Sequence, residues 1–207
     1  MLKLNINHQE SYSRGELLLR SFFGWLYIAI PHLFLLMFYA IWIYIAIFVA
    51  WWIILFTGKT PDFFYNTMLG YNRWYVRLTA RLLNLSDGYP SFGPSGEDDN
   101  TSLSFEHVHI GRGQLLLRSF FGMFYVGIPH GICLYVRTLG TYILVFLAWW
   151  VVLFTGKYPE GWHKFNVGTI RWGTRVGLYL TFLSDKYPPF NGAPEEMEEA
   201  DKPLDQV

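Results

Sequence analysis

The chain is a tandem duplication, and no other feature constrains its fold as strongly. Residues 14–92 align without a gap with residues 112–190 at a constant offset of 98, and 38 of the 79 aligned pairs are identical. One matching segment, SRGELLLRSFFGWLYIAIPH, returns in the second half as GRGQLLLRSFFGMFYVGIPH. Self-similarity over a whole unit indicates two copies of one supersecondary structure. We therefore expect one repeat in residues 1–92 and a second in residues 111–190.

The segments outside the repeats are two short alternating stretches, a linker and an acidic C-terminal segment. Apolar and polar residues alternate in LNINH at 4–8 and in LSFEHVHI at 103–110, which predicts two short strands that could pair with each other. The second stretch belongs to a linker at 93–110 that begins with GPSGEDDNTS. The last segment, 191–207, is acidic, and we expect it to be a disordered tail.

Each repeat contains an apolar segment that is too long for a simple membrane span. No Asp, Glu, Lys or Arg occurs from Phe22 to Phe56, a run of 35 residues. As one helix this run would be about 52 Å long, whereas the hydrocarbon core of a bilayer is about 30 Å thick. Polar residues interrupt the run of the second repeat at 137–141. We therefore predict hairpins at 18–56 and 116–154, which either cross the bilayer or enter it and return on the same side.

A third element follows each predicted hairpin, at 63–85 and 161–183. Its charged residues share one helical face and its apolar residues cover the other, which is the pattern of a helix lying in the membrane interface. The sequence thus predicts an all-α integral membrane protein with two parallel repeats, each a two-helix transmembrane hairpin followed by an interfacial amphipathic helix. The residues expected to bind lipid headgroups are Arg20, Arg73, Arg77, Arg81, Arg118, Lys164, Arg171 and Arg175.

The distribution of charge predicts an orientation. The two repeats carry 14 basic and 5 acidic side chains, whereas the remaining segments carry 2 basic and 11 acidic ones. Of the basic residues in the repeats, only Arg137 falls at a predicted turn, and the others fall on the side that holds both termini. Because positively charged segments stay in the cytoplasm, we expect a multi-pass protein with both termini and the linker on the cytoplasmic side.

The dipeptides Pro31-His32 and Pro129-His130 are candidates for an intramembrane polar site. An ionisable residue in a membrane segment is a functional candidate by default, and each proline removes one helical hydrogen bond. Two facing imidazoles could ligate a b-type haem or relay protons. Alternatively, each histidine hydrogen-bonds a carbonyl freed at the kink or a neighbouring tyrosine. We favour this structural role and expect no cofactor.

Motifs of enzymes and of metal sites are absent from the sequence. It has no Walker loop, GxSxG elbow, HExxH or CxxC. The single cysteine, Cys133, rules out a disulfide framework and a cysteine-based zinc site. His107 and His109 alone are a weak metal signal. We therefore expect no catalytic residue, no bound metal and no nucleic-acid partner.

Four elements occur in order in the second repeat: IPH, LFTGKYP, RWxxR and SDKYPPF. Because of these four elements, residues 14–92 and 112–190 resemble a bacterial membrane-protein family known as domain of unknown function 4389. Members of that family look like one copy of this unit. The first repeat departs from the pattern at Arg81, where the second has Tyr179. The resemblance implies a bacterial inner-membrane protein and implies no activity.

Four hypotheses of function follow. We expect a non-enzymatic inner-membrane protein, an accessory or scaffold subunit of a larger membrane complex, whose partners are membrane lipids, especially anionic ones, and another integral membrane protein. A membrane-shaping or lipid-binding hairpin protein is the first alternative, because paired hairpins followed by amphipathic helices have that layout. A bis-histidine haem or proton-relay protein built on His32 and His130 is the second. A transporter is the weakest, because it would need more polar residues within the membrane.

Overall fold

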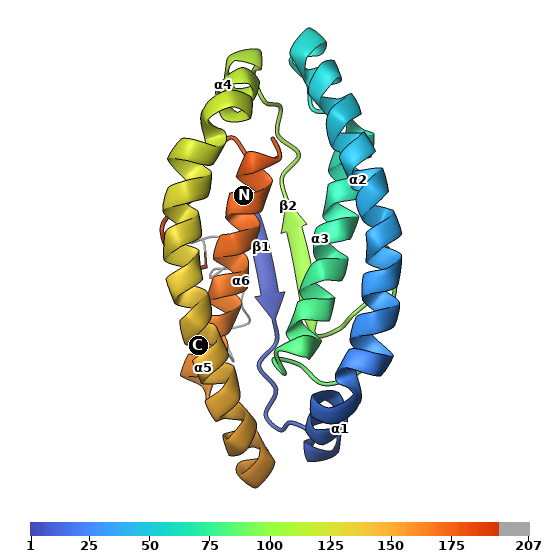
Figure 1. Ribbon diagram of the computed structural model, residues 1–207, viewed down its shortest axis with the longest axis vertical. Coiled ribbons are helices and arrows are strands. Elements are labelled where there is room, and N and C mark those ends of the chain that lie inside the picture. The colour runs from blue at the N-terminus through green and yellow to red at the C-terminus, as the bar shows by residue number, and fades with distance from the viewer. Residues whose placement is uncertain (195–207) are drawn as a thin grey trace.

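Two equivalent repeats and a short ribbon make up the fold (Figure 1). The computed structural model describes residues 1–194, so nearly all of the predicted acidic tail lies outside the described residues. The first repeat consists of α1 (Arg14–Gly24), the π-helical turn η1 (Trp25–Ala29), α2 (Ile30–Thr57) and α3 (Asp62–Leu82). The second consists of α4 (Arg112–Gly122), the π-helical turn η2 (Met123–Gly127), α5 (Ile128–Thr155) and α6 (Glu160–Leu180). The strands are β1 (Leu2–Ile6) and β2 (Thr101–Phe105).

The predicted hairpins are wrong. Residues 14–57 and 112–155 each form one continuous helix of 44 residues, and each is long and apolar enough to cross a membrane. The polar residues at 137–141 interrupt the hydropathy without breaking the helix, and two of them, Arg137 and Thr141, have partners inside the protein. Arg137 donates to the hydroxyl of Thr169 at 3.0 Å. The length limit that motivated a turn applies only to a helix that crosses a bilayer.

Local signals set the ends of the long helices. The side chain of Ser13 accepts a hydrogen bond from the backbone N–H of Glu16 at 3.3 Å and caps the first of them. Gly58 and Gly156, both with φ of 72°, end the two helices in the left-handed conformation that favours glycine. The third elements, α3 and α6, are helices close to their predicted positions.

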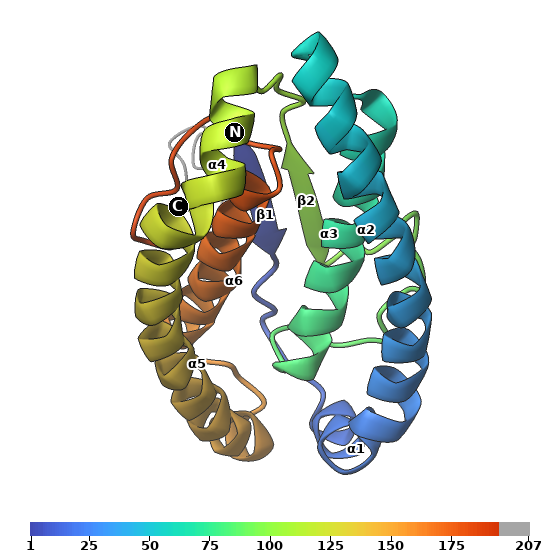
Figure 2. The ribbon, with the colours of Figure 1, turned by 45° about the horizontal axis from the view of Figure 1, so that its top comes forward.

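The two repeats are related by an approximate twofold axis. Figures 1 and 2 show α2 and α5 running in opposite directions at the two edges of the molecule. The indole N–H of Trp51 donates to the hydroxyl of Ser119 at 2.9 Å, and that of Trp149 donates to Ser21 at 2.7 Å. These two contacts are the same contact with the repeats exchanged, which is the mark of twofold symmetry. The long helices of the two repeats are therefore antiparallel to each other within the molecule.

The predicted strands pair as an antiparallel ribbon at the centre of the molecule (Figure 1). Leu4 pairs with Leu103 in the middle of the ribbon, α3 packs on β2 and α6 packs on β1. Arg73 donates to the carbonyl of Leu103 at 2.8 Å, and Arg171 donates to the carbonyl of Leu4 at 2.8 Å. These equivalent arginines satisfy carbonyls at the two outer edges of the ribbon, where unpaired backbone groups would otherwise remain.

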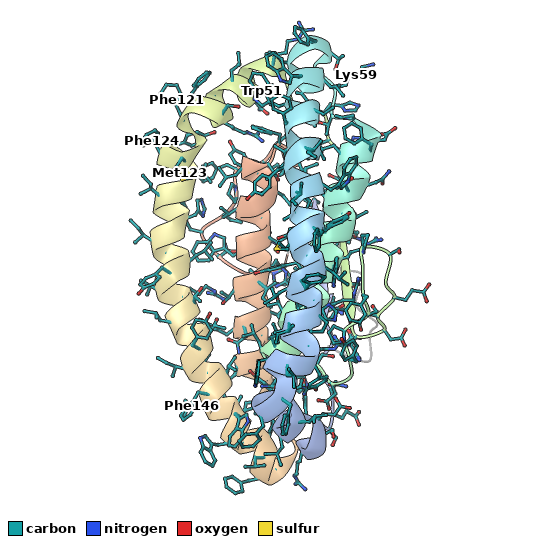
Figure 3. The ribbon with its side chains drawn as sticks, turned by 45° about the vertical axis from the view of Figure 1, so that its right-hand side comes forward. Trp51, Lys59, Phe121, Met123, Phe124 and Phe146 are labelled. Carbon is teal, nitrogen blue, oxygen red and sulfur yellow. The ribbon has the colours of Figure 1, made fainter. Side chains whose placement is uncertain are left out.

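The long helices bury one narrow stripe and expose the rest. Buried positions recur every three or four residues from Leu17 to His32 and again from Ile43 to Ile54, as in a helix with a single packed side. We call the exposed residues of 14–57 and 112–155 the outer face; most of them are apolar. Such an extended apolar patch is rare on a soluble monomer and indicates a contact surface. Figure 3 shows four of its residues pointing away from the molecule: Phe121, Met123, Phe124 and Phe146.

Candidate functional site

Each long helix carries a buried histidine that is hydrogen-bonded to a tryptophan. His32 and His130 have no exposed surface. Trp74 of α3 donates its indole N–H to Nδ1 of His32 at 2.8 Å, and Trp172 of α6 donates to Nδ1 of His130 at 2.9 Å. At Nδ1 the partner of each histidine is therefore an indole and not a carbonyl or a tyrosine. A side chain of the following helix takes that place and fastens the two helices together.

Aromatic rings enclose each histidine. Phe92 stacks on His32 with ring centroids 4.1 Å apart and an interplanar angle of 10°, and Tyr89 lies 5.5 Å away. All four positions recur at the offset of 98, where the ring of Phe190 stacks on His130 at 3.8 Å. We call His32, Trp74, Tyr89 and Phe92 the His32 cluster. The His130 cluster consists of His130, Trp172, Tyr187 and Phe190.

A proline and a π-helical turn shape the long helix beside each cluster. Pro31 has no N–H for the carbonyl of Tyr27, four residues earlier. The hydroxyl of Tyr89 donates to that carbonyl at 3.1 Å, and Tyr187 donates to the carbonyl of Tyr125 at the same distance. The freed carbonyl that the sequence predicts is therefore satisfied by a tyrosine of the SDxYP element and not by the histidine. π-helical turns of this kind often accompany functional sites.

The two clusters are separate. Every ring contact of His32 and of His130 is with a residue of its own repeat. Because Nδ1 accepts the indole proton, a neutral imidazole carries its own proton on Nε2. That atom is buried in both clusters. The arrangement does not bring the two imidazoles face to face, which the bis-histidine hypothesis requires.

Most residues predicted to bind lipid headgroups point into the protein. Arg20 is buried and forms ion pairs with Glu16 at 3.0 Å and Asp87 at 2.7 Å. Arg118, its equivalent in the second repeat, is also buried and donates to the carbonyl of Ser184. These two buried side chains therefore connect the start of each long helix to the segment that follows the third helix of the same repeat.

The arginines of α3 and α6 are also turned inward. Arg77 donates to the carbonyl of Gly93, and Arg81 forms a buried ion pair with Asp98 at 2.9 Å. Arg175 is buried as well. The predicted basic face of these helices is thus covered by the ribbon and by the connecting segments. α3 and α6 therefore do not present a solvated basic face, which the predicted interfacial helices would have.

Two residues of the predicted set remain at the surface. Lys164 is exposed and pairs with Glu160, one turn earlier, at 2.6 Å. Arg73 is exposed too, although it donates to the ribbon as described above. An exposed ion pair contributes little stability, and Glu160 already neutralises the charge of Lys164.

Four exposed cations outside the predicted set lie at the ends of the long helices. Lys59 and Lys157 directly follow the glycines that end α2 and α5, and Figure 3 shows Lys59 at the tip of α2. Arg14 and Arg112 each donate to a carbonyl in the last turn of the opposite long helix, at 3.1 and 2.6 Å. Each end of the molecule therefore carries an arginine from one repeat and a lysine from the other.

The remaining four histidines hydrogen-bond backbone groups in the segments next to the third helices. His107 and His109 both hydrogen-bond the backbone of Thr60, so the fold itself uses them. His8 and His163 lie with ring centroids 5.0 Å apart. His163 is buried, and burial lowers its pKa to about 4. Among residues 1–194, no group of three or more His, Cys, Asp or Glu side chains is placed to hold a metal ion.

The fold and the clusters define a class of protein: two twofold-related helical repeats, each with one long apolar helix fastened to the next helix by a buried histidine and tryptophan. The chain belongs to the family described as a domain of unknown function, DUF4389, whose model matches residues 19–93 and 116–191. One match falls in each repeat, which confirms both the resemblance and its tandem arrangement. No curated protein and no solved structure matches the chain.

Proposed function

We propose that the protein is a non-enzymatic, lipid-binding protein of the bacterial inner membrane that lies with its two long helices in the plane of one leaflet. The observation that carries this proposal is the outer face, in which two antiparallel 44-residue helices present apolar side chains along their whole length. A body that is apolar on one side and polar on the opposite side rests at the boundary between headgroups and acyl chains, as an amphipathic helix does.

The length of the helices favours this orientation over a crossing. The apolar run of about 52 Å would have to tilt by about 55° from the bilayer normal to fit a hydrocarbon core of about 30 Å. Transmembrane helices usually tilt by about 0–40°. A helix that lies in the plane has no such limit, which explains why the run can continue without a turn.

The position of the ribbon supports the same orientation. β1 and β2 lie midway along the length of the molecule (Figure 1), and their outward side chains, such as Lys3 and Asn5, are exposed. If the long helices crossed a bilayer, these polar groups would lie near its middle, where a charge is costly. With the helices in the plane, the ribbon and the chain terminus at Met1 stay on the aqueous side.

The twofold symmetry gives both repeats the same orientation. When the axis lies along the bilayer normal, two antiparallel helices present equivalent faces to one leaflet. The exposed cations at each end, Arg14 with Lys157 and Arg112 with Lys59, then lie at headgroup level. Each contributes about 1 kcal/mol of attraction to anionic lipid. Because basic residues favour the cytoplasmic side, we place the protein on the cytoplasmic leaflet with both termini in the cytoplasm.

The accessory-subunit hypothesis stays a prediction and uses the same surface. A second integral membrane protein would cover part of the outer face, and the rest would stay in contact with lipid. The haem and proton-relay hypothesis has less support, because each histidine is enclosed in its own cluster.

Lys59 and Lys157 end two antiparallel helices, so their accessibility tests the orientation. Each would be changed to cysteine in a Cys133→Ala background and treated with a membrane-impermeant maleimide in spheroplasts and in inverted vesicles. In-plane insertion predicts that both cysteines react from the same side, together with a ribbon control, Ser102→Cys. Reaction of the two lysine positions from opposite sides would establish a crossing and overturn the proposal. Recovery of the protein in the soluble fraction would overturn it too.

A further inference from the structure

We propose that a groove beside α2 holds the acyl chain of a membrane lipid, an inference that rests on the proposed insertion of the outer face. The groove has a volume of about 430 Å³, which is within the range of ligand-sized pockets. It lies between the middle of α2, α3 and the segment that follows α3. Its lining includes Leu35, Phe38, Tyr39, Trp42, Trp74 and Phe92.

The polar atoms of the lining side chains all have partners inside the protein. The hydroxyl of Tyr39 donates to the carbonyl of Thr67 at 3.3 Å, and the indole N–H of Trp42 lies 3.4 Å from the hydroxyl of the same residue. The indole N–H of Trp74 donates to His32. The groove therefore presents ring faces and hydrocarbon to its occupant. This chemistry fits an unbranched hydrocarbon chain.

The second repeat fills the corresponding space with its own side chains. Phe165 lies so close to Gly140 that its Cζ would be 3.4 Å from a Cβ atom on that glycine. The guanidinium of Arg137 lies over the same ring, 4.1 Å from its centroid. Three paired positions account for the difference between the repeats: Thr67 and Phe165, Tyr39 and Arg137, and Trp42 and Gly140. The smaller Thr67 leaves room in the first repeat, where Tyr39 and Trp42 turn toward it.

The groove opens on the outer face, and this position indicates which molecule would occupy it. Leu35, Phe38 and Trp42 are exposed, so the groove is continuous with the surface that we propose to lie in the leaflet. In that orientation the nearest hydrocarbon is the acyl chain of a neighbouring phospholipid. A chain that runs along α2 and contacts Trp74 and Phe92 is covered on more than one side, which favours it over a chain that touches a bare helix.

Photolabelling with a lipid tests the groove directly. The full chain would be placed in nanodiscs of phosphatidylcholine that contains a diazirine on one acyl chain, and labelled peptides would be located by mass spectrometry. We expect label at residues 35–42 and 92 well above the label at 133–140. Leu35→Trp should reduce labelling at these positions about tenfold, the factor expected if roughly two methylene groups are excluded from the groove. Leu33→Trp, also exposed on α2, is the matched control and should leave the labelling unchanged.

The outcomes separate this inference from the proposed function. Equal labelling of both repeats, or labelling that Leu35→Trp does not change, would overturn the groove and still agree with an inserted outer face. Absence of acyl label from both α2 and α5 would overturn both. A circular-dichroism spectrum and a melting temperature equal to those of the native chain would establish that the Leu35→Trp variant is folded.

Discussion

The hydroxyl of Tyr89 donates to the carbonyl of Tyr27 across 3.1 Å and joins two segments that lie 62 residues apart. That carbonyl is available because Pro31 has no N–H to donate to it. In the second repeat, Tyr187 makes the same bond to Tyr125. The tyrosine of each SDxYP element thus replaces a donor that the helix lost to its proline.

Replacing Tyr89 by phenylalanine should lower the free energy of unfolding by about 1 kcal/mol, the usual net value of one hydrogen bond. Pro31→Ala restores a backbone N–H, so the double variant should lose less stability than the two single changes predict together. Thermal unfolding of the four proteins in mild detergent measures this coupling. Strictly additive effects would show that the hydroxyl does not substitute for the missing donor.

Replacing His32 by alanine should destabilise the protein by about 1–3 kcal/mol, because the buried indole N–H of Trp74 loses its acceptor. Asparagine can place its amide oxygen near the position of Nδ1, so His32→Asn should lose less. Denaturant unfolding followed by tryptophan fluorescence compares the two variants. If both lose the same stability, packing of the ring and not its hydrogen bond is what the His32 cluster requires.

Arg171→Met should destabilise the protein by about 2–3 kcal/mol, because the buried guanidinium donates to the carbonyls of Leu4 at 2.8 Å and Gly192 at 2.9 Å. Lys164→Met on the same helix should change the free energy of unfolding by less than about 0.5 kcal/mol, because its ion pair is exposed. Urea denaturation of both variants gives the comparison. A smaller loss in Arg171→Met than in the lysine control would contradict the role given to the ribbon edge.

Stability should fall as the pH drops from about 6.5 toward 4. The folded state holds the pKa of His163 at about 4, below its ordinary value of 6.5, because the ring is buried. Between these two values the unfolded chain binds the proton and the folded chain does not. The contribution is therefore complete above pH 6.5 and reaches a loss of about 3 kcal/mol near pH 4. Melting temperatures measured across this window should vary less in His163→Asn, and an unchanged slope would refute the assignment.

Changing Lys59 and Lys157 to glutamine should reduce the preference of the protein for anionic lipid. Each exposed cation near a charged surface contributes about 1 kcal/mol, so the ratio of bound phosphatidylglycerol to phosphatidylcholine should fall about fivefold for each lysine. Native mass spectrometry of protein released from mixed nanodiscs measures the ratio. Lys164→Gln is the control, because Glu160 already neutralises that lysine. An equal effect in the control would point to net charge and not to the ends of the long helices.

The elements that the sequence predicts correctly are those with a local or repeated signature. The offset of 98 established the two repeats, alternation indicated strands that do pair, and helical periodicity located α3 and α6. The sequence also directed attention to His32 and His130. The sequence analysis did not identify Trp74 and Phe92 as partners of His32, or their equivalents as partners of His130. The RW and SDxYPxF elements recur in both repeats and could have indicated them.

The amino-acid sequence by itself determined that this chain is a duplicated unit with a long apolar, helix-forming run in each copy. The tertiary structure decided whether that helix turns and which way the arginines point. A run that is apolar on every side predicts a helix with no face in water, and it does not show whether lipid or the rest of the protein covers each side. Arginines on one face of a helix likewise have the same spacing in the sequence whether that face meets water or the protein interior. For Arg20 and Arg81 the deciding partners, Asp87 and Asp98, come from segments that only the folded chain brings alongside.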